Sequence, residues 1–170
     1  MKQHYTILLL TFTMCINFSG FGQMDQIKLQ VDSLKYLKQN TFDCKSVTWR
    51  IIANKKAAIP FLIDKLDDTT ITAAKDKCKK TNFRVGDLAY LTLAKILPLP
   101  FSAVTGVQCD VIKDACQLGV FEYIETNRQK FKAQVQTYYN KKSENLKWVP
   151  IHSNHLTPCQ LKNNIKGRYE

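Results

Sequence analysis

The sequence predicts an all-α protein, an irregular helical bundle or a short helical array of six or seven helices. Apolar residues recur at intervals of three and four along most of the chain, and the alternating pattern of strands is almost absent. Pro98 and Pro100 end one of these segments, and Pro60 and Pro158 lie in the first turn of two others. Apolar residues make up 45% of the chain and charged residues 23%, as is typical of a globular domain.

Residues 1–22 have the pattern of a secretory signal peptide. Lys2 provides a positive start, the stretch from Ile7 to Phe18 is mostly apolar, and small residues lead up to Gly22. The apolar stretch is shorter than the ~20 residues that span a bilayer. We therefore expect cleavage near Gly22/Gln23 and export to the periplasm or the medium. One helical domain over residues 23–170, with no integral membrane span, would remain.

Three helices are expected in the first part of this domain, over residues 24–39, 43–54 and 57–66. Each has apolar residues on one side at helical spacing, and the third has the clearest period, with Ile59, Leu62, Ile63 and Leu66. Pro60 lies in the first turn of the third helix, where a missing N–H costs nothing. Residues 69–85 then form a polar connection longer than is usual between packed helices, which indicates a functional or a loosely ordered loop.

The next segment, residues 88–97, is apolar on nearly all sides, which predicts a helix at the centre of the core. Asp87 is its candidate N-cap, and Pro98 and Pro100 end it. Residues 101–108 are expected to form a loop that turns at Gly106. A short helix is expected over residues 110–117.

The longest helical stretch covers residues 119–141, with a kink or a break at Asn127. Its aromatic residues are expected mainly in the core. If Tyr138 and Tyr139 are exposed beside Lys141-Lys142, however, they form an aromatic and basic binding candidate.

The C-terminal part is expected to contain one extended segment and one short helix. Residues 146–151 would extend over the core with Trp148 as their anchor. Thr157 and Gln160 form a capping box with Pro158 at the first helical position, which predicts a last helix over residues 158–166.

Two of these segments resemble the junction of two HEAT-type repeats. Residues 58–68 read Ala-Ile-Pro-Phe-Leu-Ile-Asp-Lys-Leu-Asp-Asp, and residues 86–94 read Gly-Asp-Leu-Ala-Tyr-Leu-Thr-Leu-Ala. In that family a helix that ends in Leu-x-Asp leads into a helix with an Ala-x-x-x-Leu face. The resemblance covers residues 58–97 and implies a HEAT-like array that binds other molecules rather than an enzyme. The chain also resembles small exported bacterial proteins.

The charge of the chain favours an anionic partner. The 25 basic and 14 acidic residues give a net charge of +11, of which only Lys2 lies in the leader. An envelope component and an acidic protein both fit such an excess. The densest basic run lies in the polar connection and supplies the candidate binding residues Lys75, Lys77, Lys79, Lys80 and Arg84. Phe83 is the only aromatic residue beside it, so a base-stacking surface for nucleic acid is poorly supported.

Five cysteines follow the leader, and an exported chain permits disulfides. Because five is odd, at least one thiol stays free, binds something or pairs with another chain. The candidate pairs are Cys44–Cys78 and Cys109–Cys116. The second pair requires a loop, because a continuous helix would separate its members by about 10.5 Å along the axis, beyond the ~7 Å reach of a disulfide.

The leading interpretation is a non-catalytic binding domain without a cofactor. No nucleophile elbow, phosphate loop or dinucleotide fingerprint is present in the sequence. One alternative is a small zinc-dependent hydrolase with the ligands His152, His155 and Cys159, because imidazole and thiolate suit zinc. A second alternative is an inhibitor or immunity-type protein that blocks an exported enzyme.

Overall fold

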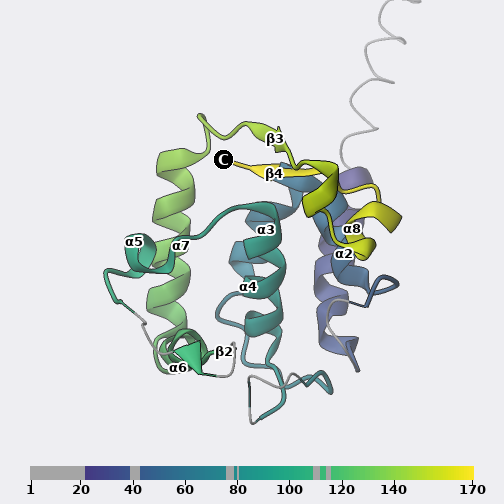
Figure 1. Ribbon diagram of the computed structural model, residues 1–170. Helices are drawn as coiled ribbons and strands as arrows, with labels where there is room; N and C mark the ends of the chain where they lie inside the picture. Colours follow the sequence, from purple (N-terminus) through teal and green to yellow (C-terminus); the bar gives the residue numbers. More distant parts are fainter. Residues whose placement is uncertain (1–21, 39–42, 76–78, 80, 109–111, 114–115) are drawn as a thin grey trace, which may run out of the picture.

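The computed structural model describes residues 22–38, 43–75, 79, 81–108, 112–113 and 116–170. Within these residues helices dominate, and strands occur only as two small two-stranded sheets, which confirms the all-α class (Figure 1). Residues 1–21 of the predicted leader lie outside the described residues, so its cleavage stays a prediction. No helix in the described part of the chain is long and apolar enough to cross a membrane.

The three helices expected in the first part of the domain are present, although the second begins four residues later than expected. A helix over residues 22–32 continues into the 3-10 turn η1 (Ser33–Tyr36) and packs near α2 (Val47–Ala53). The Oγ of Ser46 caps α2 by accepting from the backbone N–H of Thr48 at 3.3 Å. The turn η2 (Lys55–Ala58) then leads into α3 (Ile59–Asp64), with Pro60 in its first turn as expected.

The central core helix is α4 (Val85–Ile96), which is buried along most of its length. It lies between α7 (Arg128–Lys142) on one side and α2 with the N-terminal helix on the other (Figure 1). The prediction that Asp87 is its N-cap is wrong, because α4 begins earlier than expected, with Arg84 as the N-cap residue. Asp87 is the third helical residue, and its carboxylate accepts from the backbone N–H of Arg84 at 2.9 Å.

The connection over residues 69–85 is ordered where the structure describes it. Its two arms form an antiparallel ribbon around the bridge between Ile71 and Arg84. Backbone hydrogen bonds of 2.9 Å join Thr72 to Phe83 and Phe83 to Ala74. These bonds hold the two arms next to the start of α4. Of the two interpretations that the sequence allowed, a functional or a loosely ordered loop, the second does not apply to the described arms.

Two short elements after α4 differ from the sequence-based expectation. Residues 101–108 contain a helix, α5 (Phe101–Thr105), which ends at Gly106 with a φ of +71°, as glycine readily allows. The short helix expected over residues 110–117 is wrong for its described part, which forms the paired strands β1 (Ile112–Lys113) and β2 (Cys116–Gln117). Elements of two to five residues are too short to show a period in the sequence.

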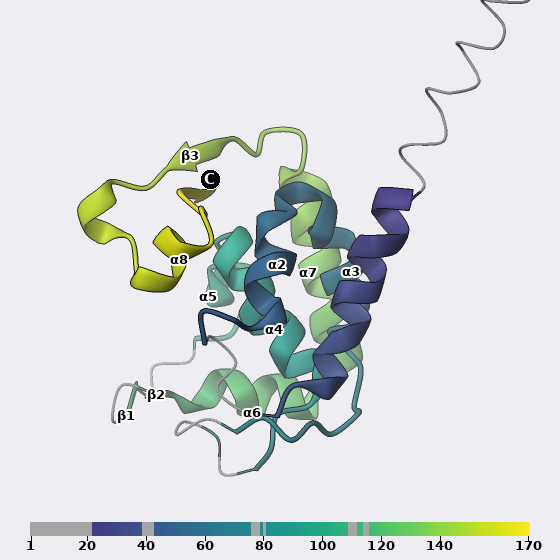
Figure 2. The ribbon, with the colours of Figure 1, turned by 90° about the vertical axis from the view of Figure 1, so that its right-hand side faces the viewer.

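The long helical stretch is broken at Asn127, as predicted, into α6 (Leu118–Thr126) and α7. The C-terminal residues 146–170 then form a strap over one end of the bundle (Figure 2). In this strap β3 (Trp148–Pro150) pairs antiparallel with β4 (Gly167–Tyr169), which confirms the extended segment. Between them lie η3 (Ser153–His155) and α8 (Pro158–Lys162), which ends four residues earlier than expected.

A disulfide between Cys44 and Cys159 attaches the strap to the segment before α2. The prediction of a Cys44–Cys78 bond is therefore wrong. The two partners are 115 residues apart in sequence, and only the return of the strap to the N-terminal part brings them together. The other predicted pair, Cys109–Cys116, falls on residues whose side chains lie outside the described part.

Candidate functional site

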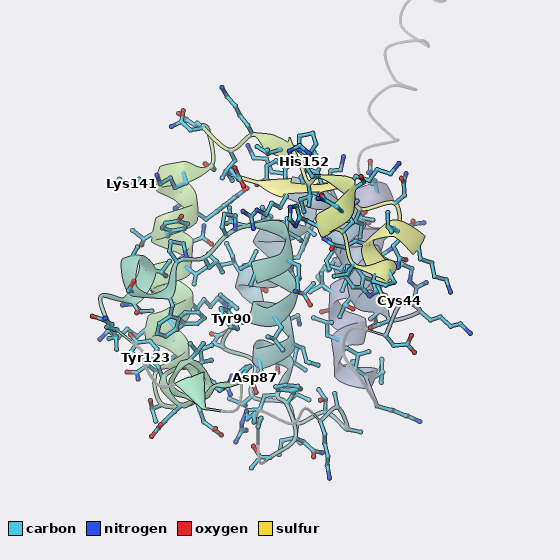
Figure 3. All side chains as sticks on the ribbon, in the orientation of Figure 1. Cys44, Asp87, Tyr90, Tyr123, Lys141 and His152 are labelled. Carbon is cyan, nitrogen blue, oxygen red and sulfur yellow. A yellow bond between two sulfur atoms is a disulfide. The ribbon has the colours of Figure 1, made fainter. Side chains whose placement is uncertain are left out.

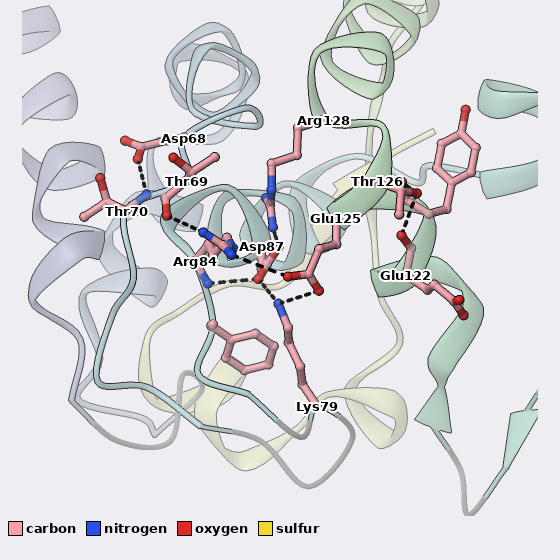
Figure 4. A network of polar contacts seen from close by, with 12 residues as sticks. Asp68, Thr69, Thr70, Lys79, Arg84, Asp87, Glu122, Glu125, Thr126 and Arg128 are labelled. Atoms are coloured by element: carbon pink, nitrogen blue, oxygen red, sulfur yellow. Dashed lines mark hydrogen bonds and ion pairs between the residues drawn. The ribbon is translucent and has the colours of Figure 1, made fainter.

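Two of the five residues of the predicted basic binding run, Lys79 and Arg84, are engaged within the protein, which corrects their expected role as open binding residues. The side chain of Lys79 is only 6% exposed, and its Nζ lies 2.5 Å from Asp87 Oδ2. The Arg84 guanidinium donates to the carbonyl oxygen of Thr69 at 3.0 Å and lies 3.6 Å from Glu125 (Figure 4). Lys75 is exposed, whereas Lys77 and Lys80 lie outside the described residues.

Asp87 is the centre of this buried network. Its carboxylate is fully buried and also accepts from Arg128 Nη2 at 2.9 Å, and the Arg128 side chain is only 8% exposed. Three elements thus meet at one carboxylate: the ribbon through Lys79, the start of α4, and the start of α7 (Figure 4). Asp87 pairs with both cations in the interior, while Arg128 Nη1 is buried with no hydrogen-bond partner among the described residues. The network therefore holds the fold together rather than forming an open binding surface.

The predicted zinc site is also wrong. The sulfur of Cys159 is bonded to Cys44, so it supplies no thiolate. No group of three possible ligands of the histidine, cysteine and carboxylate types exists among the described residues. His152 and His155 instead line a pocket of about 490 Å³ between the end of α4 and the strap.

A second pocket, of about 550 Å³, lies between α5 and α7, and we call it the α5–α7 groove. Its volume is in the range of typical ligand sites. It combines an apolar floor with long basic side chains. The lining residues are Ala103, Val104, Lys130, Ala133, Gln134, Thr137, Tyr138, Lys141 and Lys142.

The sequence of α7 explains how the groove forms. Residues 130, 134, 138 and 141 follow one another at intervals of four, four and three and so share one face of the helix. Opposite this face, α5 is attached to α7 by the Phe101 ring, whose centroid lies 6.0 Å from that of the Phe131 ring. The amide of Gln134 also donates to the carbonyl oxygen of Thr105 at 3.1 Å. The small side chains of Ala103 and Ala133 leave the space between the two helices open.

The basic residues of α7 divide into two sets. The helix carries five lysines and arginines and no acidic residue. Arg128 is paired with Asp87, and Lys132 Nζ lies 3.1 Å from both Asp64 and Asp67. Partial burial alone would lower the pKa of Lys132, but the two carboxylates outweigh it and hold this pKa above the ordinary lysine value.

The other set, Lys130, Lys141 and Lys142, lines the groove. All three are exposed, and none has a carboxylate within ion-pair distance among the described residues. The groove lining itself contains no acidic residue. This surface therefore carries positive charge that the described fold does not neutralise.

These lysines stand at the two ends of the groove. Lys130 and Lys141 are eleven positions apart on α7, which corresponds to about 16 Å along the axis at ~1.5 Å per residue. Figure 3 places Lys141 at the end of α7 that is remote from Tyr123 and Asp87. The lining offers cations and an apolar floor but no carboxylate, imidazole or thiol, so the groove is equipped to hold an anion rather than to transfer protons.

The sequence predicted that Tyr138 and Tyr139 could form an aromatic and basic binding site with Lys141 and Lys142, and only Tyr138 lines the groove with them. Tyr138 is half-buried and lines the groove beside Lys141 and Lys142. Tyr139 packs against the core instead, and burial, with a smaller contribution from Tyr169, raises its pKa. The groove wall made by α5 was missed. The basic character of α7, however, is visible in the sequence as five basic residues without an acidic residue between positions 128 and 142.

Comparisons with known proteins give no match to a protein family, to a curated protein or to a solved structure. The resemblance of residues 58–97 to HEAT-type repeats therefore stays a prediction.

Proposed function

We propose that this chain is a non-catalytic, exported binding domain whose anionic partner occupies the α5–α7 groove. The observation that carries the proposal is the division of charges on α7: two basic side chains are neutralised within the fold, and three face a pocket that contains no acid. Unmatched charge in a concave site attracts and orients ligands of opposite sign. The Cys44–Cys159 bond supports the export part, because such bonds persist in oxidising compartments.

The test compares two variants with the same change in net charge. The groove variant is Lys130→Glu/Lys141→Glu/Lys142→Glu. The control variant is Lys38→Glu/Lys162→Glu/Lys166→Glu, which reverses three exposed lysines that lie outside the groove and have no ion pair among the described residues. Circular dichroism establishes that both variants are folded.

The binding of polyglutamate, of inorganic polyphosphate and of phosphatidylglycerol vesicles to the purified full-length chain is measured at low and at physiological salt. We expect at least one probe to bind, and its affinity to fall at least tenfold in the groove variant and less than twofold in the control. A tenfold loss corresponds to about 1.4 kcal/mol. Equal losses in the two variants, or no binding of any probe at low salt, would refute the proposal.

A further inference from the structure

We propose that the ligand of the α5–α7 groove is a short extended segment of a partner protein, apolar at its centre and acidic at both ends. This inference rests on the proposed anion-binding function of the groove and specifies the chemical class of the ligand. It follows from the position of the charges, the nature of the floor between them and the shape of the site.

The charges are separated, not continuous. Lys130 stands at one end of the groove and Lys141 with Lys142 at the other, about 16 Å apart along α7. An extended peptide covers this distance with about five residues, at ~3.3 Å per residue. A matching segment therefore carries its carboxylates about five positions apart.

Between the two ends the lining is mostly apolar, with Gln134 and Thr137 as its polar members. Ala103 and Val104 come from α5, and Ala133 and the half-buried Tyr138 ring come from α7. A uniformly charged polymer would place some of its anions over this floor, where they lose water without gaining a partner. Apolar side chains at the same place are instead removed from water, which is favourable by ~25 cal/mol per Å² of apolar area.

Among the polar groups of the lining, Thr137 can bond to the backbone of a bound peptide. Gln134 is occupied within the protein, because its amide donates to Thr105 and its carbonyl oxygen accepts from the Tyr123 hydroxyl at 3.0 Å. The Thr137 hydroxyl donates to the carbonyl oxygen of Ala133 at 2.9 Å and keeps lone pairs that can accept from a peptide N–H.

Other anionic surfaces fit the groove less well. Of the apolar lining residues, Val104 and Tyr138 are half-buried between α5 and α7, so a flat lipid surface would reach mainly the exposed Ala103 and Ala133. A single-stranded nucleic acid stacks its bases on a series of aromatic rings, and the groove offers the ring of Tyr138 alone among its lining residues.

The test uses three labelled octapeptides in fluorescence anisotropy with the purified full-length chain. The matching probe is Glu-Glu-Val-Ala-Val-Ala-Glu-Glu, whose valines favour an extended backbone. The permuted probe, Val-Ala-Glu-Glu-Glu-Glu-Val-Ala, has the same composition and charge with the acids at the centre. The third probe is octaglutamate. We expect the matching probe to bind at least ten times more tightly than the permuted one.

Variants then separate the two parts of the inference. The groove variant with three reversed lysines should lose the matching probe, and the control variant with Lys38, Lys162 and Lys166 reversed should keep it. Ala133→Trp fills the groove without a change of charge and should weaken the matching probe at least tenfold. Ala103→Trp, at an exposed site on α5, should also weaken the matching probe at least tenfold. It is used instead if Ala133→Trp does not fold.

The inference is overturned, and the binding function is kept, if octaglutamate, polyphosphate or phosphatidylglycerol vesicles bind as tightly as the matching probe and lose affinity in the groove variant. It is also overturned if both tryptophan variants bind the matching probe normally. If the groove and control variants do not differ for any probe, the proposed function fails together with the inference.

Discussion

Helix α7 presents two kinds of basic residue, and their difference separates the folding role of charge from its binding role. On one side, Arg128 and Lys132 meet the carboxylates of Asp87, Asp64 and Asp67. On the groove side, Lys130, Lys141 and Lys142 face an apolar floor without an acid. The same residue type on one helix therefore stabilises the bundle at some positions and remains available to a ligand at others.

The ribbon over residues 69–85 shows the same distinction between paired and unpaired basic residues. It contains the densest run of basic residues in the chain, yet Lys79 is buried against Asp87 and Arg84 is bonded to the backbone of Thr69. Local charge density thus pointed to a run in which at least two basic side chains, Lys79 and Arg84, are paired within the fold. A binding surface is better recognised by basic residues that the fold does not neutralise than by their number.

The strongest test of the paired side removes its central carboxylate. We expect Asp87→Asn to lower the free energy of unfolding by about 3–5 kcal/mol, because Lys79 and Arg128 would remain buried without a full counter-charge. Urea unfolding followed by circular dichroism measures the loss. Asp25→Asn, at an exposed site, is the control and should change stability by less than about 0.5 kcal/mol. A loss below about 1 kcal/mol for Asp87→Asn would contradict the structural role of the network.

The fold was predictable where a long segment has a clear period. The segments over residues 57–66 and 88–97 and the break at Asn127 were found because the apolar spacing or its interruption is visible in the sequence. The helix α5 and the strands β1 and β2 were missed because elements of two to five residues carry no such signal.

The candidate site was predictable only in part, because its meaning depends on contacts between distant residues. Asp87 and Arg128 are 41 positions apart, and Lys132 and Asp64 are 68 apart. No local pattern shows that these pairs form, so the sequence could not tell which lysines remain unpaired. The sequence did associate Tyr138 with Lys141 and Lys142, since helical neighbours are local.

A second prediction concerns the close approach of α4 to the end of α3. A Cβ at Gly86 would lie 2.4 Å from the carbonyl oxygen of Leu66 and 3.0 Å from Arg128 Nη1. Gly86→Ala therefore forces the backbone of Leu66 away from α4 beside the buried network, and we expect a loss of about 1–3 kcal/mol, as for other overpacked cores.

Glu144→Ala, at an exposed position after α7, serves as its control and should change the free energy of unfolding by less than about 0.5 kcal/mol. Thermal unfolding of both variants measures the difference. Equal melting temperatures would show that the backbone of Leu66 moves away from α4 without loss of stability. The tight packing beside Asp87 would then not be needed for stability.

A third prediction addresses the exposed part of the paired side. Lys132→Met should cost about 0.2–1 kcal/mol at pH 8, the range of surface ion pairs, because Asp64 and Asp67 are partly exposed. The folded pKa of Lys132 is raised above 10.5, so its contribution is present below that pH and is lost as the pH rises through the folded pKa. The stability difference between wild type and variant should therefore shrink above pH 11. A difference that is the same at both pH values would argue against the ion pair.

The smallest effect on stability is expected on the groove side. Lys130→Met/Lys141→Met/Lys142→Met should change the free energy of unfolding by less than about 0.5 kcal/mol, because these side chains are exposed and no carboxylate of the described chain depends on them. The same variant should lose most of its affinity for the acidic octapeptide with an apolar centre. A substantial loss of stability would mean that the groove lysines serve the fold after all, and the distinction between the two sides of α7 would no longer hold. Unchanged stability with lost binding would establish that α7 carries its structural and its ligand-directed charges on separate faces.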